Sequence, residues 1–224
     1  MYTLIHQDPR FYLVDKHAGV GFHREGEEDG LMDALRAGLG DAALWPVHRL
    51  DRITSGLILV ARSAETARQL GEALAGREVE KYYLALSDRK PLKKQGRVSG
   101  DMAKGRGGAW RLLASQDNPA LTQFFSYSLQ PGVRLFLLRP RTGKTHQLRV
   151  ALKSQGAPIL GDVLYGGSAA DRGYLHAYAL RFSLDGEDFR FVCPPRQGEH
   201  FTGAACRQLL DTLSAPWELS WPRA

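Results

Sequence analysis

Residues 48–56 read His-Arg-Leu-Asp-Arg-Ile-Thr-Ser-Gly, and the apolar run 57–61 follows them directly. This leucine-rich run predicts a buried strand, so the polar residues before it are expected on a loop whose far end the strand holds. Asp51 stands in this loop between Arg49 and Arg52, and nearby positive charge favours the ionised form of a carboxylic acid. The stretch alone fits either a reactive carboxylate beside a sheet or an ordinary loop salt bridge.

Length and composition indicate a globular protein with a substantial core. A chain of 224 residues buries roughly 70% of the surface that its unfolded form exposes. The two cysteines, Cys193 and Cys206, form neither a disulfide framework nor a close metal pair, and the polar residues 1–10 do not resemble a signal peptide. No apolar run approaches the roughly 18 residues of a membrane span. We therefore expect a soluble, cytoplasmic, monomeric protein that forms one domain over residues 1–224.

Positive charge is concentrated in the middle of the chain. The formal net charge is +6, yet residues 89–161 hold 14 lysines and arginines against only Asp101 and Asp117, an excess of +12. Residues 118–160 contain no acid at all. A field of one sign attracts polyanions, of which nucleic acid is the commonest in cytoplasm, although a solvated basic face without a partner gives the same pattern.

Periodicity and turn residues predict an α+β fold. Strands are expected at 11–15, 57–61 and 79–86, and hairpins at 121–129 with 133–139 and at 175–184 with 188–192, around Pro131-Gly132 and Asp185-Gly186. Leucines 31, 35 and 39 predict a helix that Gly40 ends, and Ser63 is expected to cap a second helix that ends at Gly76. Because strands outnumber helices and many are linked by hairpins, we expect a mixed, largely antiparallel sheet with flanking helices.

Three further segments carry predictions of their own. Thr145 is expected to cap a helix that stops at Gly156, and a final helix is expected over 199–213. Residues 89–108 are rich in Lys, Arg and Gly with little periodicity, which indicates an exposed, mobile loop that could face nucleic acid.

Several kinds of chemistry fit poorly. A metal site built on His48, Asp51 and His146 lacks the tighter Cys or His spacing that zinc sites usually show, so we expect no metal. A Ser-His-Asp hydrolase would need a Gly-x-Ser-x-Gly elbow, which is absent. The Gly143-Lys-Thr sequence is not a phosphate loop, because that motif requires glycine where Leu138 stands.

The loop motif around Asp51 resembles the catalytic motif of the RluA-type RNA pseudouridine synthases, with Asp51 in place of the family's catalytic aspartate. The resemblance runs from about residue 11 to about residue 201. The other matches follow in the family's order: Lys16, Ala18 and Gly19 in an early turn, Lys81-Tyr-Tyr-Leu-Ala85, Ala120-Leu-Thr122, Gly143-Lys-Thr-His-Gln-Leu-Arg149, Gly156-Ala-Pro-Ile-Leu-Gly-Asp162, Tyr165-Gly166 and Leu175-His-Ala177. The departures are mild: His17 replaces the usual proline, Lys144 a common arginine and Ala151 a common histidine.

The resemblance implies a pseudouridine synthase-like catalytic domain that isomerises uridine in structured RNA, ribosomal or transfer, without a cofactor. It implies that Asp51 is the nucleophile, that Arg149 pairs with it, and that Tyr83 lies against the base and acts as general base. The amino-terminal S4 module of some relatives is not expected here, so the catalytic domain must contact RNA itself. The expected RNA-contacting residues are Arg49, which would fill the space of the flipped base, and Arg52, Lys93, Lys94, Arg97, Arg141, Lys144 and His146.

A second interpretation keeps the fold without the chemistry, as an inactive RNA-binding module. Intact Asp51, Tyr83 and Arg149 favour the enzyme, because an inactive relative is expected to have lost at least one of them.

Overall fold

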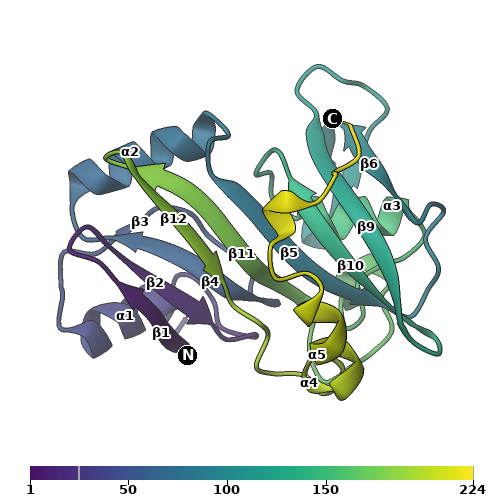
Figure 1. Ribbon diagram of the computed structural model, residues 1–224, viewed down its shortest axis with the longest axis horizontal. Coiled ribbons are helices and arrows are strands. Elements are labelled where there is room, and N and C mark those ends of the chain that lie inside the picture. Colours follow the sequence, from purple (N-terminus) through teal and green to yellow (C-terminus); the bar gives the residue numbers. More distant parts are fainter. Residues whose placement is uncertain (25, 224) are drawn as a thin grey trace.

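One large mixed sheet forms the centre of the protein, as a computed structural model covering residues 1–24 and 26–223 shows (Figure 1). Among these residues the sheet has ten strands, and its main path runs β1-β2-β4-β11-β5-β10-β9-β6, with β12 beside β11 and β3 beside β4. The strands are β1 (Tyr2–Gln7), β2 (Phe11–Lys16), β3 (Trp45–Pro46), β4 (Thr54–Ala61), β5 (Glu80–Ser87), β6 (Gln95–Gly100), β9 (Ala120–Gln130), β10 (Val133–Pro140), β11 (Leu175–Leu184) and β12 (Glu187–Val192).

The pairing of β4 with β11 decides where the loop of Asp51 lies. These two strands are parallel, with Leu175 opposite Thr54 and Ala177 opposite Gly56, whereas the other pairs in the sheet are antiparallel. Gly56 has φ 109°, and a Cβ there would lie 2.3 Å from the Ala177 carbonyl oxygen, so the close approach requires glycine. The loop before β4 therefore emerges beside the start of β11. The expected mixed, largely antiparallel α+β fold is confirmed.

Helices flank the sheet, largely where the sequence predicts them. Helix α1 (Leu31–Leu39) ends at Gly40 in the left-handed conformation. Helix α2 (Ala64–Ala75) begins at Ser63, whose hydroxyl accepts a hydrogen bond from the Thr66 amide. The others are α3 (Gln147–Ser154), α4 (Glu199–Thr202) and α5 (Ala204–Asp211). Both expected hairpins are confirmed by the pairing of β9 with β10 and of β11 with β12.

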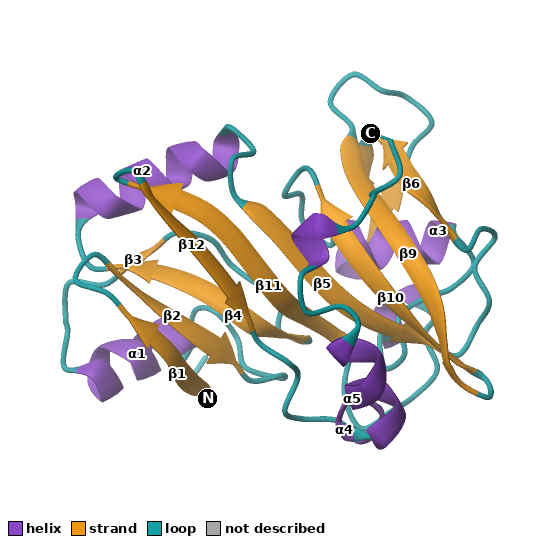
Figure 2. Ribbon diagram, in the orientation of Figure 1, coloured by secondary structure: helices purple, strands orange, loops and turns teal. Residues whose placement is uncertain are grey.

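The two faces of the sheet carry different structures. The C-terminal segment crosses in front of β5, while α3 lies behind β9 and β10 (Figures 1 and 2). Successive residues of β5 point to opposite faces. Tyr82 packs with Trp217 and Trp221 of the C-terminal segment, whereas Tyr83 faces a cavity on the side of α3. No helix in the described ranges combines the length and the apolar character needed to cross a membrane.

The prediction of a mobile loop over residues 89–108 is wrong. Strand β6 pairs with β9 from Gln95 to Gly100 and buries Val98. A separate two-stranded ribbon follows, formed by β7 (Met102–Lys104) and β8 (Trp110–Leu112), with a short 3-10 turn between them. Main-chain hydrogen bonds to a partner strand distant in sequence hold this segment, and composition does not reveal such pairing.

Two helix boundaries also differ from expectation. His146, not Thr145, precedes α3, because its backbone adopts a positive φ of 56° and delays the first helical turn to Gln147. The final helix expected over 199–213 is two short helices, since Gly203 is extended and separates α4 from α5. Residues 2–7, to which no strand was assigned, form the edge strand β1.

Candidate active site

Asp51 lies in a tight turn directly before β4. The Thr54 amide donates to the Asp51 carbonyl over 3.0 Å, and Leu50 is buried beneath the turn. The fully buried Lys16 ammonium donates to the carbonyls of Arg52, His17 and Val20, so it ties the early turn to this loop. The carboxylate itself is about one quarter exposed, at 23%, and lines a cavity of about 300 Å³. The backbone is therefore held while the carboxylate stays accessible.

Arg149 approaches Asp51 from the first turn of α3. Its Nη1 donates to Asp51 Oδ2 over 3.3 Å, while Nε and Nη2 donate to the two oxygens of Asp162 over 2.7 and 2.8 Å. Both Arg149 and Asp162 are buried. A bidentate pair fixes the plane of a guanidinium. Asp162 therefore orients Arg149, and Arg149 presents one remaining nitrogen to Asp51.

The arginines beside Asp51 in the sequence do not make this ion pair. Arg52 pairs instead with Glu28 over 2.8 Å, and the partner of Asp51 is the distant Arg149. The loop salt bridge with these neighbours, one of the two readings that the stretch alone allows, is therefore not the contact that the structure shows. Arg149, the partner that the family resemblance implies, lies there instead.

Tyr83 reaches the same cavity from β5. Its side chain is buried at 9% exposure. Burial and the negative charge of Asp51 raise the pKa of the Tyr83 phenol well above its usual range. The hydroxyl therefore keeps its proton at neutral pH in the free protein, which weighs against Tyr83 as a base in that state.

A hydrogen-bonded group closes the side of the cavity near α3. The Tyr165 hydroxyl lies 2.8 Å from His146 Nδ1 and accepts a hydrogen bond from the Trp110 amide. His146 Nε2 is 4.0 Å from Asp51 Oδ2. The Arg149 guanidinium stacks on the Tyr165 ring, 4.8 Å from its centroid. These contacts link the β7–β8 ribbon to the surroundings of Asp51.

The structure brings together some of the predicted RNA-contacting residues. Arg49, Lys144 and His146 line the cavity with Asp51, and Arg141 lines an adjoining one. The others lie outside both cavities: Arg52 at its ion pair with Glu28, and Lys93, Lys94 and Arg97 exposed on β6 or just before it.

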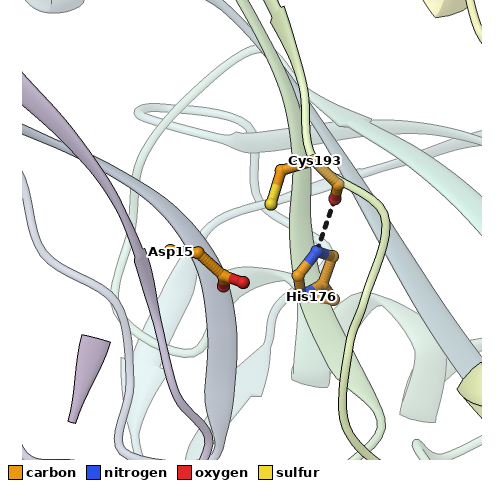
Figure 3. Close-up of side chains that lie close together, drawn as sticks. All are labelled: Asp15, His176 and Cys193. Carbon is orange, nitrogen blue, oxygen red and sulfur yellow. Dashed lines mark hydrogen bonds between the residues drawn. The ribbon is translucent and has the colours of Figure 1, made fainter. Parts of the chain in front are cut away.

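One cluster among the described residues has the donors of a metal site. Asp15, His176 and Cys193 offer ligand atoms within 4.8 Å of one another (Figure 3). However, His176 Nε2 lies 2.7 Å from the Cys193 carbonyl, to which it must donate, and Nδ1 lies 2.7 Å from the Ser55 hydroxyl. Both ring nitrogens are occupied, so the histidine offers no free lone pair to an ion. We interpret the cluster as structural.

Sequence reasoning gave no role to Asp162, Lys16 or Lys81. A signal existed for Asp162, which is the first acid after the acid-free residues 118–160. A lone carboxylate that ends a strongly basic stretch is a natural partner for one of its cations. For Lys16 and Lys81 the sequence gives no indication of a role beyond their positions in the family motifs.

The sheet and this cavity define the class of protein. Residues 10–154 match the family model described as RNA pseudouridylate synthase, and the chain belongs to that family. It is an RNA pseudouridine synthase, an isomerase of the RluA type.

Individual proteins agree with this class. An "Uncharacterized RNA pseudouridine synthase" of Haemophilus influenzae is 46% identical over 198 residues, covering 88% of each chain. "Ribosomal large subunit pseudouridine synthase C" of Haemophilus ducreyi is 32% identical over 95% of this chain and 68% of its own. The solved structure "Human RNA Pseudouridylate Synthase Domain Containing 1" superimposes with a TM-score of 0.77 at 26% identity, covering 96% of this chain and 95% of that one.

Proposed function

We propose that Asp51 is the nucleophile with which this enzyme isomerises specific uridines in structured RNA, ribosomal or transfer. The observation that carries the proposal is the Asp51–Arg149–Asp162 arrangement, in which a locked guanidinium presents one nitrogen to an accessible carboxylate. The proposal includes action as a monomer in the cytoplasm.

The reaction exchanges bonds within one nucleotide. The bond between uracil N1 and ribose C1′ breaks, the base turns, and a bond forms between C5 and C1′. C5 loses a proton and N1 gains one, so the product is an isomer of the substrate. Asp51 supplies an electron pair to the ribose or to the base, forming a covalent intermediate that its later departure resolves. The step requires no external oxidant, reductant or cofactor.

Arg149 donates a hydrogen bond to Asp51 and fixes the direction of its carboxylate before attack. Tyr83 supplies a flat ring against which the target base rests, with a protonated hydroxyl. When Asp51 becomes an ester or adduct it loses its charge, and one of the two causes that raise the pKa of Tyr83 disappears. The phenol can then release its own proton more readily, to supply the proton that N1 gains, and the resulting phenolate accepts the proton that C5 loses.

The uridine must leave its stack to reach this cavity. Arg49 is exposed at the cavity rim, where its guanidinium can occupy the space that the base vacates. The apolar side chains of Leu50, Leu148 and Leu175 line the same cavity and exclude water from the intermediate.

The direct test supplies purified protein with total RNA from a strain that lacks it, in separate ribosomal and transfer fractions. Pseudouridine counted by mass spectrometry should rise in at least one fraction. No increase in either fraction would contradict the proposed substrate.

A further inference from the structure

A second cavity, of about 460 Å³, adjoins the cavity of Asp51. The two share part of their walls, so they lie directly beside each other. The residues lining both are His48, Lys81, Pro140, Thr142, Gly143 and Lys144. A ligand larger than one nucleotide can therefore extend from the first cavity into the second.

The charges of the second cavity are nearly all positive. Arg77, Lys81, Arg141 and Lys144 line it, and none of these four makes an ion pair among the residues that the structure describes. The one acid in its wall, Glu80, is already paired with Arg139. The cavity therefore offers uncompensated positive charge.

Lys81 lies where the two cavities meet. A Cβ built on Gly143 would be 3.6 Å from Lys81 Nζ, and Lys81 contributes to lowering the pKa of His48. Within residues 1–24 and 26–223 the Lys81 ammonium has no hydrogen-bond acceptor, and burial lowers its pKa. Lys81 is partly buried, and an anionic ligand beside its amine would offset the cost of desolvation and favour the charged form. The neighbouring His48 ring carries no charge, because burial lowers its pKa to about 3 and its Nε2 accepts from the Leu59 amide.

Apolar groups form another part of the wall. Leu74 and Ala75, at the end of α2, and Val79 line the second cavity together with the cations. An apolar surface beside positive charge suits a base beside its phosphate, which is how proteins hold single-stranded nucleic acid.

We propose that the second cavity binds the nucleotide adjacent to the target uridine on the same RNA strand, and that Lys81 binds the phosphate joining the two. This inference rests on the proposed function, because the first cavity must hold the uridine. It deepens that function by assigning the enzyme a contact to sequence beyond its target.

The test changes the charge of the second cavity at Ala75, an exposed residue distant from the proposed chemistry. Ala75→Glu and Ala75→Lys place opposite charges there on side chains with similar helix propensity. Ala64→Glu is the matched control, because Ala64 is exposed at the other end of the same helix and lines neither cavity. Binding of labelled transfer RNA and ribosomal RNA fragments is measured together with the rate of pseudouridine formation.

Ala75→Glu should raise the RNA concentration for half-maximal binding and rate about tenfold at low salt, and the effect should shrink as salt is added. Ala75→Lys should lower that concentration. Ala64→Glu should match wild type. If Ala75→Glu and Ala75→Lys both bind and react like Ala64→Glu, the second cavity is not on the path of the RNA.

Lys81→Met tests the proposed phosphate contact independently. Loss of one phosphate contact should weaken binding and reduce the slope of log affinity against log salt by about one. A slope equal to that of wild type would overturn the role of Lys81. Failure of the wild type to form pseudouridine would count against the proposed function, whereas normal turnover with no charge effect at Ala75 would count against the second cavity alone.

Discussion

Asp162 accepts two hydrogen bonds from Arg149, and only the third guanidinium nitrogen, at 3.3 Å, reaches Asp51. The buried carboxylate therefore determines where the arginine points. Asp51, the proposed nucleophile, and Asp162 lie 111 positions apart in the sequence, and the Arg149 side chain connects them through hydrogen bonds to both.

Asp162→Asn should reduce both stability and activity. An amide keeps the shape of the side chain but removes the charge, and breaking a buried ion pair on one side costs about 3–5 kcal/mol. Urea unfolding would measure the free energy, and pseudouridine formation the turnover. Asp188→Asn is the control, because Asp188 is exposed on β12 and its carboxylate accepts a hydrogen bond from the exposed Ser183 hydroxyl; it should leave activity unchanged and stability nearly so. Full activity in Asp162→Asn would show that the orientation of Arg149 does not depend on the Asp162 carboxylate.

Tyr83→Phe should slow turnover by at least about a hundredfold. In the proposed mechanism the ring still supports the base, but the hydroxyl assigned to proton transfer is gone. Tyr82→Phe is a matched control in the adjacent position, because the Tyr82 hydroxyl donates to Glu80 on the opposite face. That variant should lose only about 1 kcal/mol of stability and keep its activity. Equal rates in the two variants would reduce Tyr83 to a packing residue.

Acid should destabilise the protein partly through His176. Burial lowers the pKa of this histidine to about 3, whereas an unfolded histidine titrates near about 6.5. Between these values the unfolded state binds more protons, so stability falls as pH falls through this window, by at most about 1.4 kcal/mol per pH unit. Unfolding from about pH 7 to about pH 5 should show a shallower loss for His176→Gln than for wild type. Identical slopes would mean that His176 is not held neutral.

The basic residues on β6 and just before it should contribute to RNA binding from outside the two cavities. Replacing Lys93, Lys94 and Arg97 together with glutamine removes three exposed charges and should weaken binding and flatten its salt dependence. Turnover at saturating RNA should remain, because none of the three lines the cavity of Asp51. An unchanged salt slope would exclude this edge of the sheet from the RNA interface.

Much of the fold and part of the site could be predicted from the sequence because the relevant signals are local. Signals within a few residues predict three of these elements correctly: the leucine spacing of α1, the Ser63 cap of α2 and the Pro131-Gly132 turn. Asp51, Tyr83 and Arg149 stand in short motifs, and the structure brings all three to one cavity.

The remaining features of the fold and site could not be predicted, because they depend on contacts between segments that are distant in the sequence. β6 is held by main-chain pairing with β9, and its two glycines and its polar residues give no sign of this pairing in the sequence. Arg52 forms an ion pair with Glu28 rather than with its neighbour Asp51. Arg149 pairs with Asp162 because the chain that follows α3 returns to place this carboxylate beside the helix. Such choices are set by the packed sheet and not by spacing in the chain.

The central claim is that Asp51 carries the chemistry, and Asp51→Asn tests it most directly. The amide keeps the size and most of the hydrogen bonding of the carboxylate but is a very poor nucleophile. Wild type, Asp51→Asn and the exposed control Asp117→Asn would each be incubated with RNA from a strain lacking the protein. Pseudouridine would be counted by mass spectrometry, with RNA binding and unfolding measured in parallel.

We expect Asp51→Asn to fold and to bind RNA like wild type while forming pseudouridine at least about a thousandfold more slowly, a loss of about 4 kcal/mol in transition-state stabilisation. Asp117→Asn should retain full activity. If Asp51 were only half of a loop salt bridge, its substitution would cost about 1 kcal/mol of stability or less and leave turnover nearly unchanged. Pseudouridine formation by Asp51→Asn within about tenfold of wild type would contradict the account.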